Sequence, residues 1–559
     1  PDPARPPAPR LPGAGGAAAW GVALAGAGVA AAMYASSPAL AWRSDGAFHA
    51  AVTLSVARGG VPPEDPYFAG IRLLYFWGTH AWAALWLALA PALAPWTPLI
   101  ALNLAGTLAA LLAVCALAAR LGGGARAQWL ACGLAAFGAA PFAWGWVAAR
   151  AVAGEVRGLP ELRRLLTQGV DLALRSMSPG LLHPSLVFAA DKFLVLTPFA
   201  LGLALFAVGA VALLEMSTRP RAGAIVSLAL VVGAALFVHP VAGVALLGAG
   251  VAAALAGALA RRGAPFPARA WGVALGAPAL ALSPYLAAID AGRHPGLAAG
   301  LSWRGLDSLV VGGALVVPAG LGWLARRVRS GPARALFAAA VALALAGLLG
   351  RASGDNQSKL FNLLYLLLSA PAALGWLALH HRLARAGRAA LAALLALAAL
   401  PTALLCAWAY ASERGQLPES CHAPTPSERS AYAWARDSLA ADAVLVDTGV
   451  EEGGAATLAV SARRALLWGG EFMARKWDYA PGALSIRRRA AVEIAGDRPP
   501  TEDVRAFAAG LGREVALVCR RPAGASPAEF ARTLAARASW TRPLYANADL
   551  AILRVEARP

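Results

Sequence analysis

The chain has 559 residues, of which 59% are hydrophobic and only 14% are charged, and its formal net charge is +19. Soluble domains carry about 25% charged residues, so this composition excludes an ordinary soluble protein and indicates a polytopic membrane protein. The positive charge does not indicate nucleic-acid binding. Most of the surplus lies in short connectors between apolar runs, where basic residues mark the cytoplasmic side.

Apolar runs of about 20 residues, enough to cross roughly 30 Å of hydrocarbon, recur through the first three quarters of the chain. They predict a bundle of about 12–13 transmembrane helices. The first run lacks a small-residue cleavage site and leads into further runs, so we expect a retained helix. The runs lie near 14–35, 76–93, 97–119, 127–149, 193–215, 222–238, 241–260, 270–289, 308–325, 335–350, 360–380 and 388–410.

Basic connectors set the expected topology. "STRPRAG", "RRGAPFPAR", "RRVRSGPAR" and "HRLARAGR" are separated from one another by two predicted spans, so they share the cytoplasmic side. The loops 290–307 and 351–359, the connector 150–192 and the chain after Tyr410 then lie outside. The first quarter does not fit, because three predicted spans separate the basic N-terminal segment from the basic "RLGGGARAQ". Either one basic loop is external or, as we prefer, a helix between 76 and 190 is miscounted.

Composition divides the chain into a transmembrane part, 1–411, and a soluble extracytoplasmic domain, 412–559. The first part includes a first external loop, 36–75, and a second external connector, 150–192. In the tail, "TPSE" and "SPAE" are capping boxes that begin helices. Apolar strand-like runs, "AVLVD", "ALLWG", "VALVC" and "LAILRV", alternate with helical stretches near 427–439, 501–511 and 527–537, which predicts an α/β domain with a largely parallel sheet.

No glycine-rich phosphate fingerprint follows any of these strands. The pattern therefore favours a binding or lid role for the tail over nucleotide binding.

The five cysteines fall into two groups. Cys115, Cys132 and Cys406 lie in apolar runs and are expected to be small core residues. Cys421 and Cys519 both lie in the tail, where an extracytoplasmic compartment permits a disulfide.

The connector after the first run reads "WRSDGAFHAAVTLSVARGGVPPEDPYFAGIRLLYFWGTH", and its length indicates structure of its own. Asp45 and His49 are four residues apart, so a helix places them on one face. For Glu64 and Asp65, in a Pro-rich turn, we expect solvated charges. Asp45 stands at the mouth of the first span, where a half-buried carboxylate can accept a substrate proton or hold a cation.

This layout resembles the GT-C superfamily of integral membrane glycosyltransferases. The similarity is carried by "SDGAFH", "PPEDPYFAG" and "YFWGTH", by the dozen spans, and by "SERSAYAWARDSLAADAVLVD" and "PLYANADLAILRV" in the tail. The resemblance implies transfer of a sugar from a polyprenyl-phosphate donor, with Asp45 as the catalytic base. In the same connector, His49 and His80 are candidate substrate-binding residues. The chain lacks the Asp-Glu pair of protein mannosyltransferases and the Asp-x-Asp of oligosaccharyltransferases, so the acceptor and the metal dependence stay open.

A lipid-phosphate leaving group develops negative charge, which cations and hydrogen-bond donors stabilise. The external loop "GRASGDNQSKLFN" provides such groups immediately before a predicted span. The alternative is that its two cations only extend to the membrane interface. The predicted phosphate clamp and sugar-binding residues are Arg351, Asp355, Asn356, Gln357 and Lys359.

Asp191, at the start of another predicted span, is a candidate second acidic site. No His or Cys spacing indicates zinc, and no cofactor is required by the sequence, although a divalent cation at the acidic residues is one alternative.

The leading hypothesis is therefore a glycosyltransferase of the bacterial inner membrane whose tail is extracytoplasmic. Its expected partners are a polyprenyl-phosphate-linked sugar, membrane lipids and a glycan, lipid or protein acceptor, and no nucleic acid. The alternatives are a transporter or assembly partner with a periplasmic binding domain, and a transferase-like protein without chemistry. A transporter is disfavoured because no half-repeat is evident and the charges lie at span ends and in loops.

Overall fold

The computed structural model describes residues 14–36, 46–60, 62–137, 148, 150–167, 196–261, 266–290, 297–300, 306, 308–352, 357–412, 424–448, 452–471, 474, 479 and 481–556. Contacts divide the chain into two compact units. The helical unit consists of Pro1–Pro38, Ala101–Ser283 and Gly296–Arg414, and the connector–tail unit consists of Ala39–Ile100, Pro284–Pro295 and Gly415–Pro559. The domain boundaries expected from composition stay predictions.

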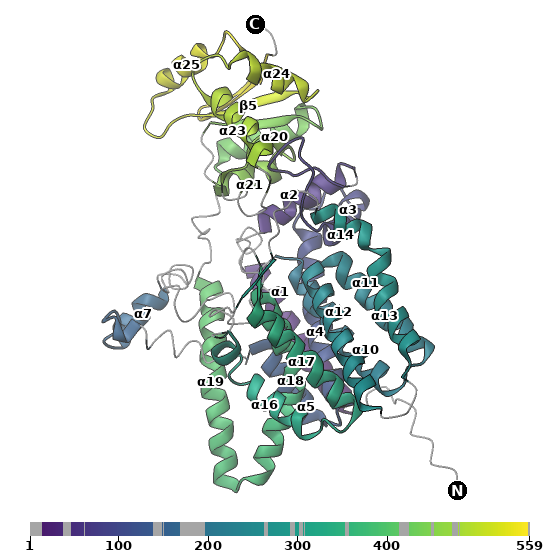
Figure 1. Cartoon of the computed structure of the whole chain (residues 1–559). Helices are drawn as coiled ribbons and strands as arrows, with labels where there is room; N and C mark the ends of the chain where they lie inside the picture. The colour runs from purple at the N-terminus through teal and green to yellow at the C-terminus, as the bar shows by residue number, and fades with distance from the viewer. Residues whose placement is uncertain are drawn as a thin grey trace. The chain divides into compact units, whose positions relative to one another are not determined.

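The helical unit is a bundle in which α10, α11, α12, α17 and α18 lie side by side (Figure 1). A short antiparallel pair, β1 and β2, joins two of its loops. Its elements are α1 (Ala14–Ser36), α4 (Thr97–Arg120), α5 (Ala125–Phe137), α7 (Leu159–Thr167), α10 (Phe199–Thr218), α11 (Ala222–Val238), α12 (Pro240–Ala260), α13 (Ala268–Ala281), β1 (Leu297–Ala299), η3 (Ser308–Gly312), α16 (Val317–Arg326), α17 (Gly331–Leu349), β2 (Gly350–Ala352), α18 (Gln357–Arg382) and α19 (Arg385–Ser412).

Each predicted apolar run contains a helix in its described residues, so the chain is a polytopic α-helical membrane protein. Within the described residues, five helices are individually long and apolar enough to cross a membrane, and α13 with α14 (Ser283–Asp290) forms a sixth if the two are one broken span. The run near 76–93 contains only α3 (Gly78–Leu89), whose 12 residues rise about 18 Å. This helix is too short to cross a membrane on its own.

Small residues allow the helices to approach closely, as in other membrane bundles. At Gly243 of α12, an added Cβ would lie 2.5 Å from the backbone N and Cα of Leu236 in α11. At Gly320 of α16, an added Cβ would lie 3.0 Å from the carbonyl oxygen of Leu368 in α18. Space therefore excludes a Cβ at Gly243 unless the helices shift, and at Gly320 it leaves room for one only if α18 gives by a few tenths of an ångström.

The connector–tail unit combines the first connector with the C-terminal part of the chain. Its elements are α2 (Gly46–Ala57), α3, α14, α20 (Pro426–Ser438), β3 (Val444–Asp447), α21 (Glu452–Ser461), β4 (Ala465–Leu466), α23 (Pro481–Ala495), α24 (Glu502–Gly510), β5 (Val515–Arg520), α25 (Pro527–Ala536), β6 (Thr541–Ala546) and β7 (Leu550–Val555). The four predicted strands and three predicted helices of the tail are confirmed, and α21, α23 and β6 are additional.

The sheet has the strand order β4-β3-β5-β7-β6. Strands β4, β3 and β5 are parallel, whereas β7 and β6 are added in antiparallel fashion. This confirms the expected α/β domain, but the sheet is mixed and not largely parallel, because two of its four strand pairings are antiparallel. Both predicted capping boxes are present, because Thr425 accepts from the Glu428 N–H and Ser526 accepts from the Glu529 N–H, with each glutamate bonded back to its cap residue.

Helices cover both faces of the sheet, and the first connector contributes to the core. Leu445 and Ala516 face a cluster that includes Phe48 of α2 and Tyr67 of the connector, together with residues of α20 and α21. The opposite face packs against α23, α24 and α25. The tail therefore shares its hydrophobic core with a segment nearly 400 residues away in sequence.

The cysteines follow the expected pattern where the structure describes them. Cys115 and Cys132 are buried in α4 and α5, and Cys519 is buried in β5. Cys421 and the side chain of Cys406 lie outside the described residues, so the disulfide stays a prediction.

Candidate functional site

The first candidate position lies at the start of α2. This helix begins at Gly46, so Asp45 directly precedes it, but Asp45 itself lies outside the described residues. His49 occupies the first turn of α2 and is buried, with 1% of its surface exposed. The Thr53 hydroxyl donates to the His49 carbonyl oxygen at 2.9 Å.

His49 and His80, which the sequence predicts as site residues 31 positions apart, lie together. His49 Nδ1 is 3.0 Å from His80 Nε2, and the ring centroids are 5.2 Å apart. A hydrogen bond between two imidazole nitrogens needs one N–H and one lone pair, so a single proton lies between these atoms. The rings of Phe48 and Tyr75 lie within 6 Å of the His49 ring. The pair can pass a proton between α2 and α3 or fix the orientation of α2.

A second candidate group belongs to the helical unit. Lys359, near the start of α18, has its Nζ 5.6 Å from the ring centroid of Phe199, the first residue of α10. The Phe199 ring lies 4.9 Å from that of His239, whose side chain caps α12 by accepting from the Ala242 N–H. The beginnings of three helices therefore converge around one aromatic ring that faces a cation.

The remaining predicted residues are only partly described. Arg351 lies on β2 opposite Ala298 of β1, and Gln357 is the first residue of α18, but the side chains of both lie outside the described residues. Asp355, Asn356 and Asp191 also lie outside them. The roles assigned to these residues stay predictions.

Sequence reasoning missed Asn362, which lies one turn after Lys359 on α18 and is fully buried. A buried amide in an apolar helix is costly unless it has hydrogen-bond partners, so such residues mark sites in membrane bundles. The available signal was a single amide within the run "LFNLLYLLL".

The expectation of solvated charges in the Pro-rich turn was wrong. Asp65 is fully buried and accepts hydrogen bonds from the Tyr479 hydroxyl and the Tyr67 N–H. Burial raises the pKa of Asp65 to about 6, against the opposing effect of the Tyr479 hydrogen bond. Glu64 is half-buried and forms an ion pair with Arg513. Both carboxyl groups are partly or wholly removed from water because the tail packs on this turn.

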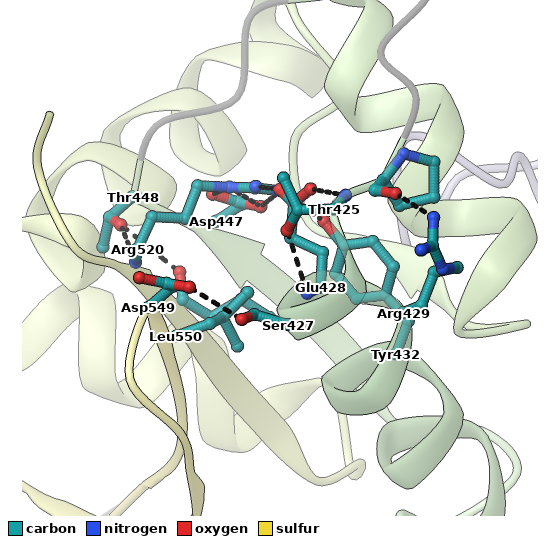
Figure 2. Close-up of polar contacts among 12 residues, drawn as sticks. Thr425, Ser427, Glu428, Arg429, Tyr432, Asp447, Thr448, Arg520, Asp549 and Leu550 are labelled. Carbon is teal, nitrogen blue, oxygen red and sulfur yellow. Dashed lines mark hydrogen bonds and ion pairs between the residues drawn. The ribbon is translucent and has the colours of Figure 1, made fainter.

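The tail also contains a buried ion-pair network at the carboxyl ends of β3 and β5 (Figure 2). The Arg520 guanidinium donates to both Asp447 carboxylate oxygens, at 3.0 and 2.9 Å, and pairs with Glu428. Burial lowers the pKa of Arg520 to about 10. Arg520 also donates to the Tyr432 hydroxyl, whose pKa is raised by burial. Glu428 in addition caps the Thr425 N–H at 2.7 Å.

This network occupies the position where an open α/β sheet usually binds a ligand. The chain leaves β3 toward β4 on one side and returns to β5 on the other, which makes the β3–β5 junction a topological switch point. Here the protein's own Arg520, Asp447 and Glu428 fill it. This arrangement agrees with the lack of a phosphate fingerprint and favours a structural role.

Among the residues that the structure describes, no three His, Cys, Asp or Glu side chains are grouped as a metal ion would need. The predicted cation site would involve Asp45, Asp191 or Asp355, which lie outside those residues. A divalent cation therefore stays an open alternative.

The bundle of apolar helices with an α/β tail is the fold of solved ArnT structures. No family model matches the sequence, and no curated protein matches it. The likeness is to solved structures. ArnT from Cupriavidus metallidurans bound to undecaprenyl phosphate superposes with a TM-score of 0.54 and 12% identity over 96% of this chain and 98% of that chain.

Two further structures are similar. ArnT from the same organism in the apo state has a TM-score of 0.52 and 14% identity over the same shares of both chains. The Archaeoglobus fulgidus oligosaccharyltransferase tethered with an acceptor peptide has a TM-score of 0.49 and 12% identity, covering 96% of this chain and 74% of that chain. At 12% and 14% identity, the likeness to the two ArnT structures shows the fold alone.

Proposed function

We propose that the protein is a glycosyltransferase that moves a sugar from a polyprenyl-phosphate donor to an acceptor at the outer face of the bacterial inner membrane. The observation that carries this proposal is the GT-C fold, shared over 98% of an ArnT chain whose structure contains undecaprenyl phosphate. The acceptor is a glycan, a lipid or a protein, and membrane lipids surround the helices.

The sidedness of the proposed site follows from the length of α3. If this 12-residue helix does not cross the membrane, only α1 and α4 separate the basic N-terminal segment from "RLGGGARAQ". Both basic segments then lie in the cytoplasm, as the positive-inside rule requires. The same count leaves the first connector, the 351–359 loop and the tail on the outside, so the proposed catalytic and phosphate-binding residues share one side.

The proposed chemistry is a single displacement at the anomeric carbon. The Asp45 carboxylate takes the proton of the acceptor hydroxyl as its oxygen forms a bond to the anomeric carbon. The bond between that carbon and the donor phosphate oxygen breaks, and its electron pair leaves with the polyprenyl phosphate. This reaction inverts the anomeric configuration. Lys359 and Arg351 offset the charge on the departing phosphate.

The test is sugar transfer from a radiolabelled polyprenyl-phosphate sugar by the full-length protein in membranes. Asp45→Asn keeps the shape of the side chain but removes the proton acceptor, so turnover should fall by a factor on the order of 10² or more. Asp503→Asn makes the same chemical change at a carboxylate whose side chain is 56% exposed, and it should leave turnover unchanged. Full activity of a well-expressed Asp45→Asn variant would reject the assignment of the base.

Lys359→Ala should instead weaken donor binding, because the lipid phosphate is present in both the ground state and the transition state. If wild-type membranes support no transfer from any polyprenyl-phosphate sugar while the protein inserts normally, the reading as a transporter or assembly partner replaces this one.

A further inference from the structure

One segment of the first connector, residues 62–74, lies against the tail through backbone hydrogen bonds, side-chain hydrogen bonds and an ion pair. We call it the docking segment. It begins by covering the free edge of the sheet, because β4 is an edge strand. The Ala69 N–H donates to the Leu466 carbonyl at 2.8 Å, and the Leu466 N–H donates to the Pro66 carbonyl at 2.9 Å. The connector thereby satisfies backbone groups that an open edge would expose.

Two arginines of the tail hold the same segment by polar contacts. Arg487 Nε donates to the Ala69 carbonyl at 2.7 Å, and its guanidinium is mostly shielded from water. Arg513 pairs with Glu64, whose Oε1 also accepts from the Gly70 N–H at 2.6 Å. The tail therefore holds the segment on both sides of the Tyr67–Phe68 turn. Before the turn it binds the Glu64 side chain, and after the turn it binds the Ala69 carbonyl.

Buried side chains complete the contact. Tyr479 donates to Asp65 and accepts from the Leu74 N–H at 3.4 Å. The Phe68 ring is packed edge-on against Trp468 and Tyr479, with centroids 5.4 and 5.6 Å away. At Gly469 an added Cβ would lie 2.3 Å from the Tyr67 Cβ. The docking segment and the tail therefore pack so closely at Gly469 that no methyl group fits between them.

The docking segment is in turn attached to α2. The Ser55 hydroxyl donates to the Glu64 carbonyl at 2.6 Å, and Arg58, just after α2, donates to the Arg463 carbonyl of the tail at 3.0 Å. α2 also packs on α21. The C-terminal half of α2 therefore cannot shift without disturbing the tail.

From these contacts we infer that Tyr479, Arg487 and Arg513 are positioning residues: they hold the docking segment, and through it α2, in the place that sugar transfer requires. The inference rests on the proposed function, since its consequence for the reaction passes through Asp45, which directly precedes α2. The tail then acts as part of the catalytic apparatus. It is not a separate binding module.

The experiment combines transfer kinetics with hydrogen exchange on the full-length protein in nanodiscs. Gly469→Ala inserts a methyl group between the docking segment and the tail, whereas Gly482→Ala adds one in α23 where nothing lies within 4 Å. The first variant should lose amide protection in residues 62–74 and lose about tenfold or more in kcat, with the donor KM changed less than about threefold. The second should behave as the wild type.

Tyr479→Phe removes the hydroxyl that bonds Asp65 and the Leu74 N–H, and Arg513→Gln removes the ion pair with Glu64; both serve if Gly469→Ala does not fold. Arg513→Lys, which keeps the charge opposite Glu64, should recover most of the activity that Arg513→Gln loses. Lost protection with unchanged kcat would overturn the positioning role while leaving the proposed function intact. Unchanged protection in Gly469→Ala would overturn the contact itself. Absence of transfer by the wild type would instead reject the proposed function, whatever the protection of residues 62–74.

Discussion

The helices of the helical unit meet through small residues such as Gly243 and Gly320, whereas the connector–tail unit joins remote segments through hydrogen bonds and ion pairs. In the first unit, apolar helices pack both on neighbours in sequence, as α10, α11 and α12 do, and on distant ones, as α5 does on α18. In the second, Asp65 meets Tyr479 across 414 residues. Local apolar pattern therefore predicts the helices of the first unit, although not which of them pack together, and long-range polar complementarity is needed to account for the second.

The helix α3 lies in the connector–tail unit, and we expect that it does not cross the membrane. Ala92→Cys, after α3, should react with a membrane-impermeant maleimide in intact cells, whereas Gly124→Cys, between α4 and α5, should react only after permeabilisation. Both positions are exposed, and the described native cysteines are buried. Labelling of Ala92→Cys only after permeabilisation, with Gly124→Cys reactive in intact cells, would show that α3 crosses and would undo the proposed sidedness.

The polar network of Figure 2 should carry a large share of the stability of the connector–tail unit. Arg520→Ala leaves Asp447 and Glu428 buried with side-chain exposures of 4% and 7%. An unpaired buried charge typically costs about 3–5 kcal/mol, which thermal unfolding and amide exchange of β3 and β5 would detect. Arg521→Ala breaks the neighbouring exposed pair with Asp549 and should cost under about 1 kcal/mol. Equal effects of the two variants would contradict a buried network.

The stability of the helical unit should fall when a side chain at a close helix contact is enlarged. Gly243→Ala places a methyl group against the backbone of α11 and should cost about 1–3 kcal/mol through overpacking. Gly248→Ala, in the same helix with nothing within 4 Å of the added Cβ, is the matched control and should be neutral or stabilising. The measurement is the midpoint of thermal unfolding in detergent. A neutral Gly243→Ala would mean that α11 and α12 are not held at this distance.

The smallest expected effect is a change with pH in the free energy that holds the docking segment against the tail. The pKa of Asp65 is raised to about 6 by burial, above its ordinary value near 3.8, so the docked state binds the proton more tightly than the released state. Docking is favoured at acidic pH and weakens by roughly 1 kcal/mol between pH 5 and pH 7. Glu64 adds to this by repelling the ionised form.

Amide exchange of residues 62–74, corrected for the intrinsic rate at each pH, measures this slope. Asp65→Asn keeps an acceptor for Tyr479 and should remove the pH dependence. Protection that increases toward pH 7 in the wild type would contradict the assignment.

Features set by local sequence could be predicted. The apolar runs located the helices, and the two capping boxes located the starts of α20 and α25, because a cap uses groups only three residues apart. The strand β6 was missed because Pro543 interrupts its apolar pattern, and a proline is tolerated there since β6 is an edge strand.

The candidate site was predictable in part. His49 and His80 lie together, although their direct contact depends on how α2 meets α3, and their role as site residues stays a prediction. The burial of Asp65 could not be predicted, because a carboxylate in a Pro-rich turn is solvated unless a distant partner such as Tyr479 covers it. Where a full span was expected near 76–93, the structure has only the 12-residue α3, since the aromatic residues before α3 pack in the core of the connector–tail unit.

The edge of β4 that Pro66 and Ala69 cover has a consequence for synthesis. The docking segment leaves the ribosome 414–418 residues before Tyr479 and Arg487. At about 5–20 residues per second this is a delay of roughly 20–80 s. During that time Phe68 and its neighbours have no tail to pack against while the helices insert. A chaperone or the membrane surface has to shield them, and a chain truncated before β4 should be a substrate for proteolysis at the first connector even when every helix has been inserted.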